Sequence, residues 1–312
     1  MNIVFMGTPN FAAVCLESII SSKHNVTGVV TAPDRQKGRG RKISESAVKR
    51  VATEHEIPLA QPEKLKAEEF HEVLRGWNAD LFVVVAFRML PEVVWAMPPK
   101  GTINLHASLL PQFRGAAPIQ RAIMQGATES GATVFRLTDE IDTGNILSSI
   151  SLEIGPNENA GSLHDRILNA GKDLLVEALD TISNGNDVET PQESLINNDI
   201  DIFEAPKIFK EDRRIDWRKS TEVVHNTIRG LSPYPGAFTV IEGSNEPYKI
   251  LDGKTCKKQD LKAGETLVVN SKLYVGTCDG CYEITKLQPA GKPAMDTSSF
   301  ARGLREELGN FS

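Results

Sequence analysis

An unbroken apolar run at residues 81–86 restricts the fold of this chain more than any other stretch of its sequence. The run reads Leu-Phe-Val-Val-Val-Ala and lacks the alternation of apolar and polar residues that marks a strand with one face in water. Such a run is typical of a strand in a parallel sheet, which is covered on both faces. The sequence therefore predicts an α/β architecture built around this strand.

Strand-like and helix-like segments alternate through the first half of the chain. The expected strands lie at residues 3–6, 26–31, 81–86, 103–105, 132–137 and 146–154. The expected helices, which show helical spacing of apolar residues, lie at residues 11–22, 46–55, 67–77, 91–97, 116–125 and 162–183. This order predicts a Rossmann-like fold, a mainly parallel sheet with helices on both faces.

The composition changes after this first half. Residues 185–206 are polar and interrupted by glycine, proline and asparagine, as is typical of a linker. Short apolar runs bounded by turns follow, with the rhythm of a small OB-like β-barrel. We therefore expect an α/β domain over residues 1–184, a linker over 185–206 and a C-terminal β-barrel domain over 207–312.

The amino-acid composition is that of an ordinary globular protein. Of its 312 residues, 40% are hydrophobic and 24% are charged, which are globular values. No apolar stretch approaches the roughly 20 residues that span a bilayer, and the first residues lack the basic start of a signal peptide. Four cysteines in a chain of this size predict reduced thiols rather than a disulfide framework. We expect a cytoplasmic protein without membrane contact, and nothing in the sequence demands more than a monomer.

Two local features invite a binding interpretation. Five cations gather in a glycine-containing stretch that we expect to be a mobile loop, namely Arg35, Lys37, Arg39, Arg41 and Lys42. The stretch follows a predicted strand, at the edge where active sites of α/β proteins gather, so it is either a solvated loop or a clamp for an anionic substrate. Cys278 and Cys281 form one Cys-x-x-Cys motif, but zinc needs about four ligands. The Asp-Gly pair between them predicts a hairpin with the two cysteines as cross-strand neighbours, and no metal.

The strongest chemical signal is Asn104-Leu105-His106, at the end of a predicted strand. Side chains two positions apart on a strand point the same way. An amide can then donate a hydrogen bond to a developing oxyanion while an imidazole moves a proton, as acyl-type transfer requires. Asp142, in an Asp-Thr-Gly turn after another predicted strand, supplies a carboxylate to orient the imidazole. The alternatives are a buried structural histidine and an ordinary turn.

The surrounding motifs resemble those of a known family. The residues that carry the resemblance are Asn104–His106, Ser108–Pro111, Arg114–Arg121 and Asp142–Gly144. They are similar to those of the formyltetrahydrofolate-dependent formyltransferases, and the likeness runs nearly end to end, from Gly7-Thr8-Pro9 to Gln288–Lys292. The basic loop and the C-terminal domain resemble those of the members that act on tRNA.

The resemblance implies an activity and the residues that perform it. The expected reaction is transfer of the formyl group of 10-formyltetrahydrofolate to the α-amino group of methionine on initiator tRNA, with Asn104, His106 and Asp142 as catalytic residues. The residues implied in folate binding are Phe87, Arg88, Met89, Ser108, Leu109, Leu110 and Pro111. The residues implied in tRNA binding are Arg35, Lys37, Arg39, Arg41, Lys42, Lys207 and Lys210. The segment at 87–90 departs from the family pattern, because Phe-Arg replaces the usual Tyr-Gly and one residue is missing.

Four other functions compete with this interpretation. Formyl transfer to a small amine, or hydrolysis of the folate, would not need the residues after 206. A sugar-nucleotide formyltransferase could carry an extra domain but would have no use for the basic loop. A non-catalytic tRNA- or nucleotide-binding protein would use the loop and leave Asn104, His106 and Asp142 without a purpose.

Overall fold

The computed structural model of the protein describes residues 1–312 except 38–41, 197–200, 257–259 and 305. The chain forms two compact units. The first contains residues 1–115, 131–152 and 166–204, and the second contains residues 116–130, 153–165 and 205–312. Among the described residues, no helix has both the length and the apolar character needed to cross a bilayer.

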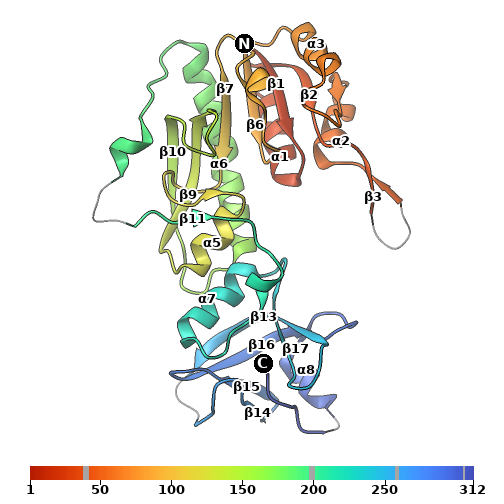
Figure 1. Ribbon diagram of the computed structural model, residues 1–312, viewed down its shortest axis with the longest axis vertical. Helices are drawn as coiled ribbons and strands as arrows, with labels where there is room; N and C mark the ends of the chain where they lie inside the picture. The colour runs from red at the N-terminus through yellow and green to blue at the C-terminus, as the bar shows by residue number, and fades with distance from the viewer. Residues whose placement is uncertain (38–41, 197–200, 257–259, 305) are drawn as a thin grey trace. The chain divides into compact units, whose positions relative to one another are not determined.

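The first unit is built on a seven-stranded sheet with the order β10-β9-β7-β6-β1-β2-β5 (Figure 1). The strands are β1 Asn2–Gly7, β2 Asn25–Val30, β5 Leu59–Ala60, β6 Leu81–Val85, β7 Thr102–His106, β9 Glu129–Arg136 and β10 Ile146–Glu153. The pairs β2–β5, β1–β2, β1–β6 and β6–β7 are parallel, and β9 is antiparallel to β7. The predicted mainly parallel sheet is confirmed.

Helices cover this sheet because its central strands are apolar on both faces. The helices are α1 Asn10–Ile20, α2 Ala47–Glu54, α3 Glu68–Gly76, α4 Glu92–Trp95 and α6 Ala160–Ser183. Val4 and Met6 of β1 share one core cluster with Phe70 and Leu74 of α3. Alternate residues of the strand point to the opposite face, and α1 packs against β1, β2 and β6. Every residue of β6 is buried, as its unbroken apolarity predicts.

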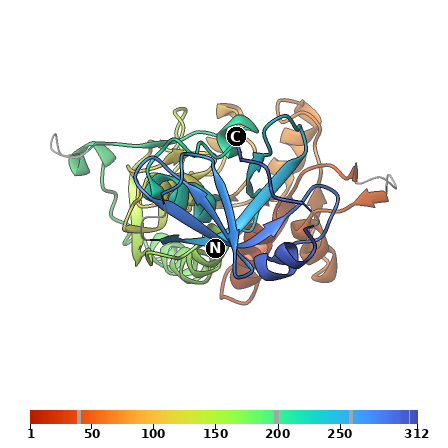
Figure 2. The ribbon, with the colours of Figure 1, turned by 90° about the horizontal axis from the view of Figure 1, so that it is seen from below.

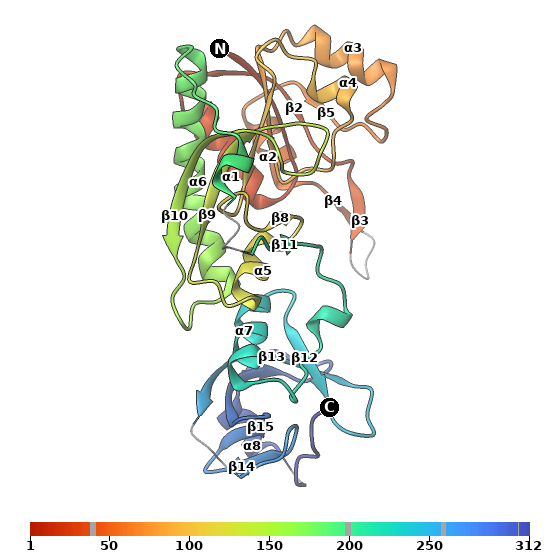
Figure 3. The ribbon, with the colours of Figure 1, turned by 60° about the vertical axis from the view of Figure 1, so that its left-hand side comes forward.

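The basic stretch differs from its prediction. Instead of a loop throughout, β3 Arg35–Lys37 and β4 Lys42–Ser44 pair antiparallel, with Lys37 opposite Lys42. The hairpin projects from the rest of the unit (Figures 1 and 3). At both ends of the stretch the backbone pairs as a ladder, although the glycines in the sequence favour a loop. Just before β3, Asp34 is bound by Lys49 and Gln61, whose hydrogen bonds hold the pKa of the Asp34 carboxyl below its usual range.

The second unit contains the predicted C-terminal domain of short strands, which is confirmed as an antiparallel sheet (Figure 2). Its order is β12-β13-β16-β15-β14, with β17 paired to β16. The elements are α7 Thr221–Leu231, β12 Ala237–Val240, β13 Pro247–Cys256, β14 Thr266–Val269, β15 Lys272–Gly276, β16 Cys281–Gln288, β17 Met295–Asp296 and α8 Thr297–Arg302. Trp217 is buried in its core, where the indole N–H donates to Thr239 at 3.0 Å.

One helix from the first half of the sequence also belongs to the second unit. Helix α5, Pro118–Met124, packs against α7. Gly230 of α7 permits this approach, because a Cβ there would lie 2.7 Å from the Met124 side chain and 3.1 Å from the Gln120 carbonyl oxygen. The remaining short elements are β8 Arg114–Gly115, paired with β11 Glu204–Ala205, and the 3-10 helices η1 Gln192–Leu195 and η2 Glu211–Arg213.

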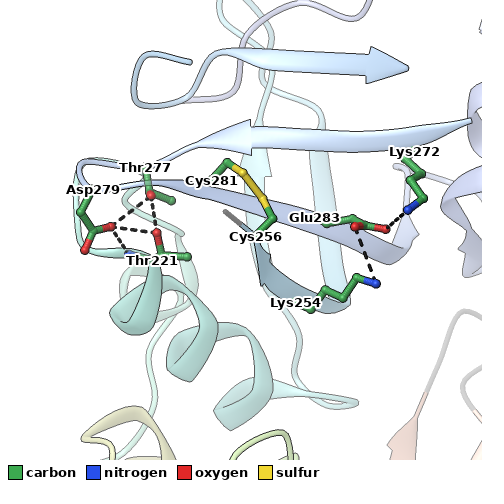
Figure 4. The surroundings of a disulfide bond; sticks show 8 residues. All are labelled: Thr221, Lys254, Cys256, Lys272, Thr277, Asp279, Cys281 and Glu283. Carbon is green, nitrogen blue, oxygen red and sulfur yellow. Dashed lines mark hydrogen bonds and ion pairs between the residues drawn. A yellow bond between two sulfur atoms is a disulfide. The ribbon is translucent and has the colours of Figure 1, made fainter. Parts of the chain in front are cut away.

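The Asp-Gly signal does mark a hairpin, between β15 and β16. The predicted pairing of its cysteines is wrong, however, because Gly276 lies opposite Cys281 and the exposed Cys278 lies in the turn. Asp279 in the same turn accepts the backbone N–H of Thr221 at 2.8 Å and so caps α7 (Figure 4). The described residues contain no group of three or more His, Cys, Asp or Glu arranged to hold a metal ion.

The expectation of reduced thiols is also wrong. Cys256 and Cys281 form a disulfide across β13 and β16, with their Cα atoms 5.4 Å apart (Figure 4). The two residues are separated by 25 positions and become neighbours only through the register of these two strands. That register is a property of the folded sheet, which cysteine spacing cannot reveal.

Reducing this disulfide should destabilise the second unit. Closing a loop of this length lowers the entropy of the unfolded chain, which corresponds to about 3–4 kcal/mol of stability. Denaturant titrations followed by tryptophan fluorescence, with and without dithiothreitol, measure the difference. Cys278→Ser is the control, because this exposed thiol takes no part in the bond. Identical unfolding midpoints in the two conditions would contradict the prediction.

A buried hydrogen-bond network lies between α7 and the 153–165 segment of the same unit. His225, which is 8% exposed, has Nδ1 3.1 Å from the Tyr282 hydroxyl and Nε2 3.1 Å from the Pro156 carbonyl oxygen. The guanidinium of Arg229 donates to the carbonyl oxygens of Gly155 and Glu158 at 3.2 and 3.0 Å. Burial lowers the pKa of His225.

This histidine should make stability depend on pH. Because its pKa in the folded protein is below the ordinary value near ~6.5, the unfolded chain binds the proton first as pH falls. The contribution of His225 to the stability of the folded protein is therefore complete above pH ~6.5 and is lost progressively below it. We expect the Tm of the wild type to fall more steeply than that of His225→Gln between pH ~7 and ~5.5. Parallel Tm curves would show that His225 does not contribute.

Candidate active site

The end of β7 positions the two polar side chains singled out in the sequence. Asn104 lies beside Val84 of β6 and opposite Phe135 of β9, and His106 lies opposite Thr133. His106 is 7% exposed and meets the Phe135 ring edge-on, with centroids 6.5 Å apart. The imidazole is thus fixed in place by the sheet, at the edge where the parallel strands end.

Two acceptors flank the imidazole of His106. Nε2 lies 2.9 Å from the carbonyl oxygen of Phe113, and Nδ1 lies 3.6 Å from the carboxylate oxygen Oδ2 of Asp142. The second distance is longer than a hydrogen bond but short enough for an ion pair when the ring is protonated. A neutral imidazole has one N–H, so only the protonated ring can donate toward both acceptors. The site therefore suits a histidine that gains and returns a proton.

The turn at 142–144 holds the carboxylate in this place. Asp142 adopts a left-handed backbone conformation with φ of 55°, and its Oδ2 accepts the backbone N–H of Gly115 at 2.9 Å. Gly144 is required there, because a Cβ would lie 1.8 Å from the carbonyl oxygen of Arg136. The structure thus brings Asp142 and His106 together across more than thirty residues of sequence.

The amide of Asn104 is available to a ligand. The side chain is half-buried, and within the described part of the chain it makes no hydrogen bond. On strand β7 it lies two positions before His106, so both side chains are on the same face. An amide and an imidazole therefore share one side of the sheet.

The three predicted folate residues after β6 have different environments. Phe87 is half-buried and Met89 is 70% exposed, so both offer apolar surface. The guanidinium of Arg88 lies over the Phe87 ring at 5.5 Å and donates to the carbonyl oxygens of Pro62 and, at 3.0 Å, Glu63. Burial lowers the pKa of Arg88. Where the family pattern has glycine, this chain thus has an arginine whose hydrogen bonds connect the loop after β6 to the segment at Pro62 and Glu63.

The predicted folate residues of the next loop are mainly buried. Ser108, Leu110 and Pro111 are buried and Leu109 is half-buried. The Ser108 hydroxyl donates to the Gln112 carbonyl oxygen at 2.6 Å, and the Leu110 N–H donates to the Thr133 hydroxyl at 3.2 Å. These two polar groups therefore bond within the protein, and Leu109 presents the partly exposed side chain.

The predicted tRNA residues of the basic stretch lie on the β3–β4 hairpin. Arg35 is exposed at its base, and the backbones of Lys37 and Lys42 pair at its far end. Arg39 and Arg41 lie outside the described residues.

The other two predicted tRNA residues lie in the second unit. Lys207 and Lys210 are exposed, and the Lys207 ammonium lies 5.8 Å from the centroid of the exposed Phe209 ring. Proteins that bind single-stranded nucleic acid combine cations with exposed aromatic rings.

Sequence reasoning missed one residue beside the site, Gln192. Its side chain is fully buried and contacts the backbone of Asp142 and Gly144. The residue lies in the polar stretch predicted to be a linker, where nothing in the local pattern marks it.

Comparison with known proteins identifies the family of this chain. A family model described as formyl transferase matches residues 1–179, and one described as formyl transferase, C-terminal domain, matches residues 207–305. The methionyl-tRNA formyltransferases of Bacteroides fragilis and Flavobacterium johnsoniae are 46% and 44% identical to this chain. Each similarity covers 97% of this chain, and 95% and 96% of the two relatives.

A solved structure shares the fold. HypX from Aquifex aeolicus, in complex with tetrahydrofolic acid, has a TM-score of 0.63 and 19% identity over 99% of this chain. The chain spans about half of that protein, 50% of its length, and at this identity the likeness concerns the fold alone. Kinship rests on the family model, which matches more than half of the chain, and on relatives similar along nearly its whole length. This chain belongs to the formyl transferase family, and it is an enzyme.

Proposed function

We propose that this enzyme transfers the formyl group of 10-formyltetrahydrofolate to the α-amino group of methionine on initiator tRNA. The observation that carries the proposal is the grouping of Asn104, His106 and Asp142 at the end of β7. The similarity to methionyl-tRNA formyltransferases along 97% of the chain supports the choice of acceptor. The product, formyl-methionyl-tRNA, would serve translation initiation in the cytoplasm.

The first step is attack by the amine on the formyl carbon. A free α-amino group titrates near ~7.7–8.0, so imidazole is a strong enough base to remove its proton at neutral pH. As the C–N bond forms, the carbonyl oxygen becomes an oxyanion, which the Asn104 amide would stabilise as a hydrogen-bond donor. His106 would take the ammonium proton, and Asp142 would stabilise the imidazolium.

The second step is collapse of the tetrahedral intermediate. The oxyanion re-forms the carbonyl, the bond between the formyl carbon and N10 of the folate breaks, and the imidazolium of His106 returns its proton to N10. The products are formylated methionyl-tRNA and tetrahydrofolate. His106 returns to its neutral form, so no metal or further co-reactant is needed to balance the reaction.

The folate would bind beside the loops after β6 and β7. The partly exposed apolar side chains of Phe87, Met89 and Leu109 would face its rings. Arg88, Ser108, Leu110 and Pro111 would complete the folate site by shaping its loops, since Arg88 and Ser108 bond carbonyl groups and Leu110 and Pro111 are buried.

The tRNA would be held by the cations of the β3–β4 hairpin and by the second unit. Arg35, Lys37, Arg39, Arg41 and Lys42 would contact phosphates of the acceptor stem. Lys207 and Lys210 would extend this contact. We expect a monomer to be sufficient for activity, because every catalytic and binding role proposed above is assigned to a residue of one chain.

One assay tests the function directly. The protein is incubated with 10-formyltetrahydrofolate and Met-tRNA, and the product is analysed for formyl-methionine. Appearance of formyl-methionine supports the proposal. Transfer to a free amine or a sugar nucleotide instead, or release of formate alone, would identify one of the competing functions.

Removing the oxyanion donor should slow the reaction without unfolding the protein. We expect Asn104→Ala to lower kcat by about 10²–10³, the usual effect of losing one such donor, and Asp142→Ala to lower it as well. Steady-state kinetics and a thermal melt measure both properties. Asn145→Ala is the matched control, since its amide bonds the exposed Glu189 carboxylate. A near wild-type kcat in Asn104→Ala or Asp142→Ala, with a normal melt, would disprove that residue's role.

The hairpin should affect tRNA and not folate. We expect Arg39→Ala to raise KM for Met-tRNA while KM for the folate is unchanged. Loss of one phosphate contact should also reduce the dependence of log KM on log salt by about 1. Arg50→Ala, which removes an exposed charge of α2 outside the hairpin, is the control. Equal effects on both KM values would count against the role of the hairpin.

A further inference from the structure

The side chain of Gln192 is fully buried although it is polar. It extends from the short helix η1, in a stretch whose sequence is typical of a linker. An amide removed from water is destabilising unless its hydrogen bonds are replaced. The hydrogen-bond partners of this amide therefore indicate why a glutamine stands at position 192.

All the hydrogen-bonding capacity of the Gln192 amide is used. Nε2 donates to the carbonyl oxygens of Asp142 at 2.9 Å and Gly144 at 2.8 Å. Oε1 accepts from Nε and Nη2 of Arg114, at 3.0 and 2.6 Å. A primary amide has two N–H donors and one oxygen with two lone pairs, so each is matched. Among the natural side chains, only an amide combines these donors and acceptors in one planar group.

These partners are the two segments that surround His106. The 142–144 turn carries the carboxylate that faces its Nδ1, and the segment at 113–115 supplies the carbonyl group that faces its Nε2. The segments are also joined directly, because the Gly115 N–H donates to Asp142 Oδ2. Gln192 is a second connection between them, independent of the carboxylate.

We propose that Gln192 is a positioning residue for formyl transfer, which fixes the 142–144 turn so that the Asp142 carboxylate faces His106. The inference rests on the roles proposed above for these two residues. Asp142 has φ of 55°, a conformation that a residue other than glycine keeps only when its surroundings hold it. Gln192 binds the carbonyl group of Asp142 itself and the carbonyl group two residues later. A displacement of about 1 Å at a catalytic group can lower a rate about 100-fold.

The segment that carries Gln192 has other anchors that do not touch this turn's carboxylate. Arg136 pairs with Asp187 at 2.6 Å and with Glu189 at 2.9 Å. After η1, the Phe203 carbonyl accepts the Phe113 N–H at 2.7 Å. Anchoring of the segment can therefore be separated from the action of Gln192. Glu189 provides a matched control, because its ion pair attaches the segment from the exposed side.

The experiment compares Gln192→Met, Asp142→Ala, the double variant and Glu189→Met in the formylation assay. Methionine has nearly the length of glutamine but no amide. We expect Gln192→Met to lower kcat by about 10–100-fold with KM for both substrates within about twofold, and Glu189→Met to keep the wild-type kcat. The double variant should be no slower than Asp142→Ala, because a residue that acts through Asp142 has no further effect once that carboxylate is absent.

Gln192→Glu covers the case in which the methionine variant does not fold. It keeps an acceptor for Arg114 and loses the donors to the turn, so it too should lose kcat. A wild-type kcat in folded Gln192→Met or Gln192→Glu, alongside an inactive Asp142→Ala, overturns the role of Gln192 and leaves the catalytic assignment intact. Multiplied losses in the double variant also overturn it, since Gln192 would then act elsewhere. A wild-type kcat in Asp142→Ala disproves the proposed role of Asp142, and the inference with it.

Discussion

Burial of the parallel strands β1 and β6 on both faces is the constraint on which the catalytic unit depends. A strand that is buried on both faces carries mainly apolar side chains along its length, which favours placing polar, reactive groups at the ends of the strands. The parallel strands end along a common edge, and the loops that follow them meet there. Asn104 and His106 lie at the end of β7, the strand next to β6. The position of the His106 imidazole therefore depends on the apolar strand beside β7.

Much of this arrangement could be predicted because its signals are local. Unbroken apolarity identified β6, and helical spacing located α1, α2 and α3 to within a few residues. The spacing of Asn104 and His106 placed them on one face of a strand. The mainly parallel sheet, the family and the β-rich C-terminal domain were correctly predicted from such patterns together with the resemblance.

The remainder depends on contacts between residues far apart in the chain. The pairing of Cys256 with Cys281 follows from the register of β13 and β16, which no spacing rule contains. The β3–β4 hairpin was missed because glycines obscured a ladder of only a few residues. Gln192 was missed for a different reason. A buried amide and an exposed one look alike in a polar segment, and only the carbonyl groups that surround it distinguish them.

The two compact units do not correspond to two consecutive halves of the chain. Helix α5 and residues 153–165 come from the first half of the sequence and yet lie in the second unit, where α5 packs against α7. A cut after residue 206 would therefore not release an intact catalytic domain, because it would leave the apolar side of α5 without its cover. Residues 116–130, 153–165 and 205–312 form one structural block in three pieces, and a fragment that holds only the last piece would leave the buried Arg229 without the carbonyl groups of Gly155 and Glu158.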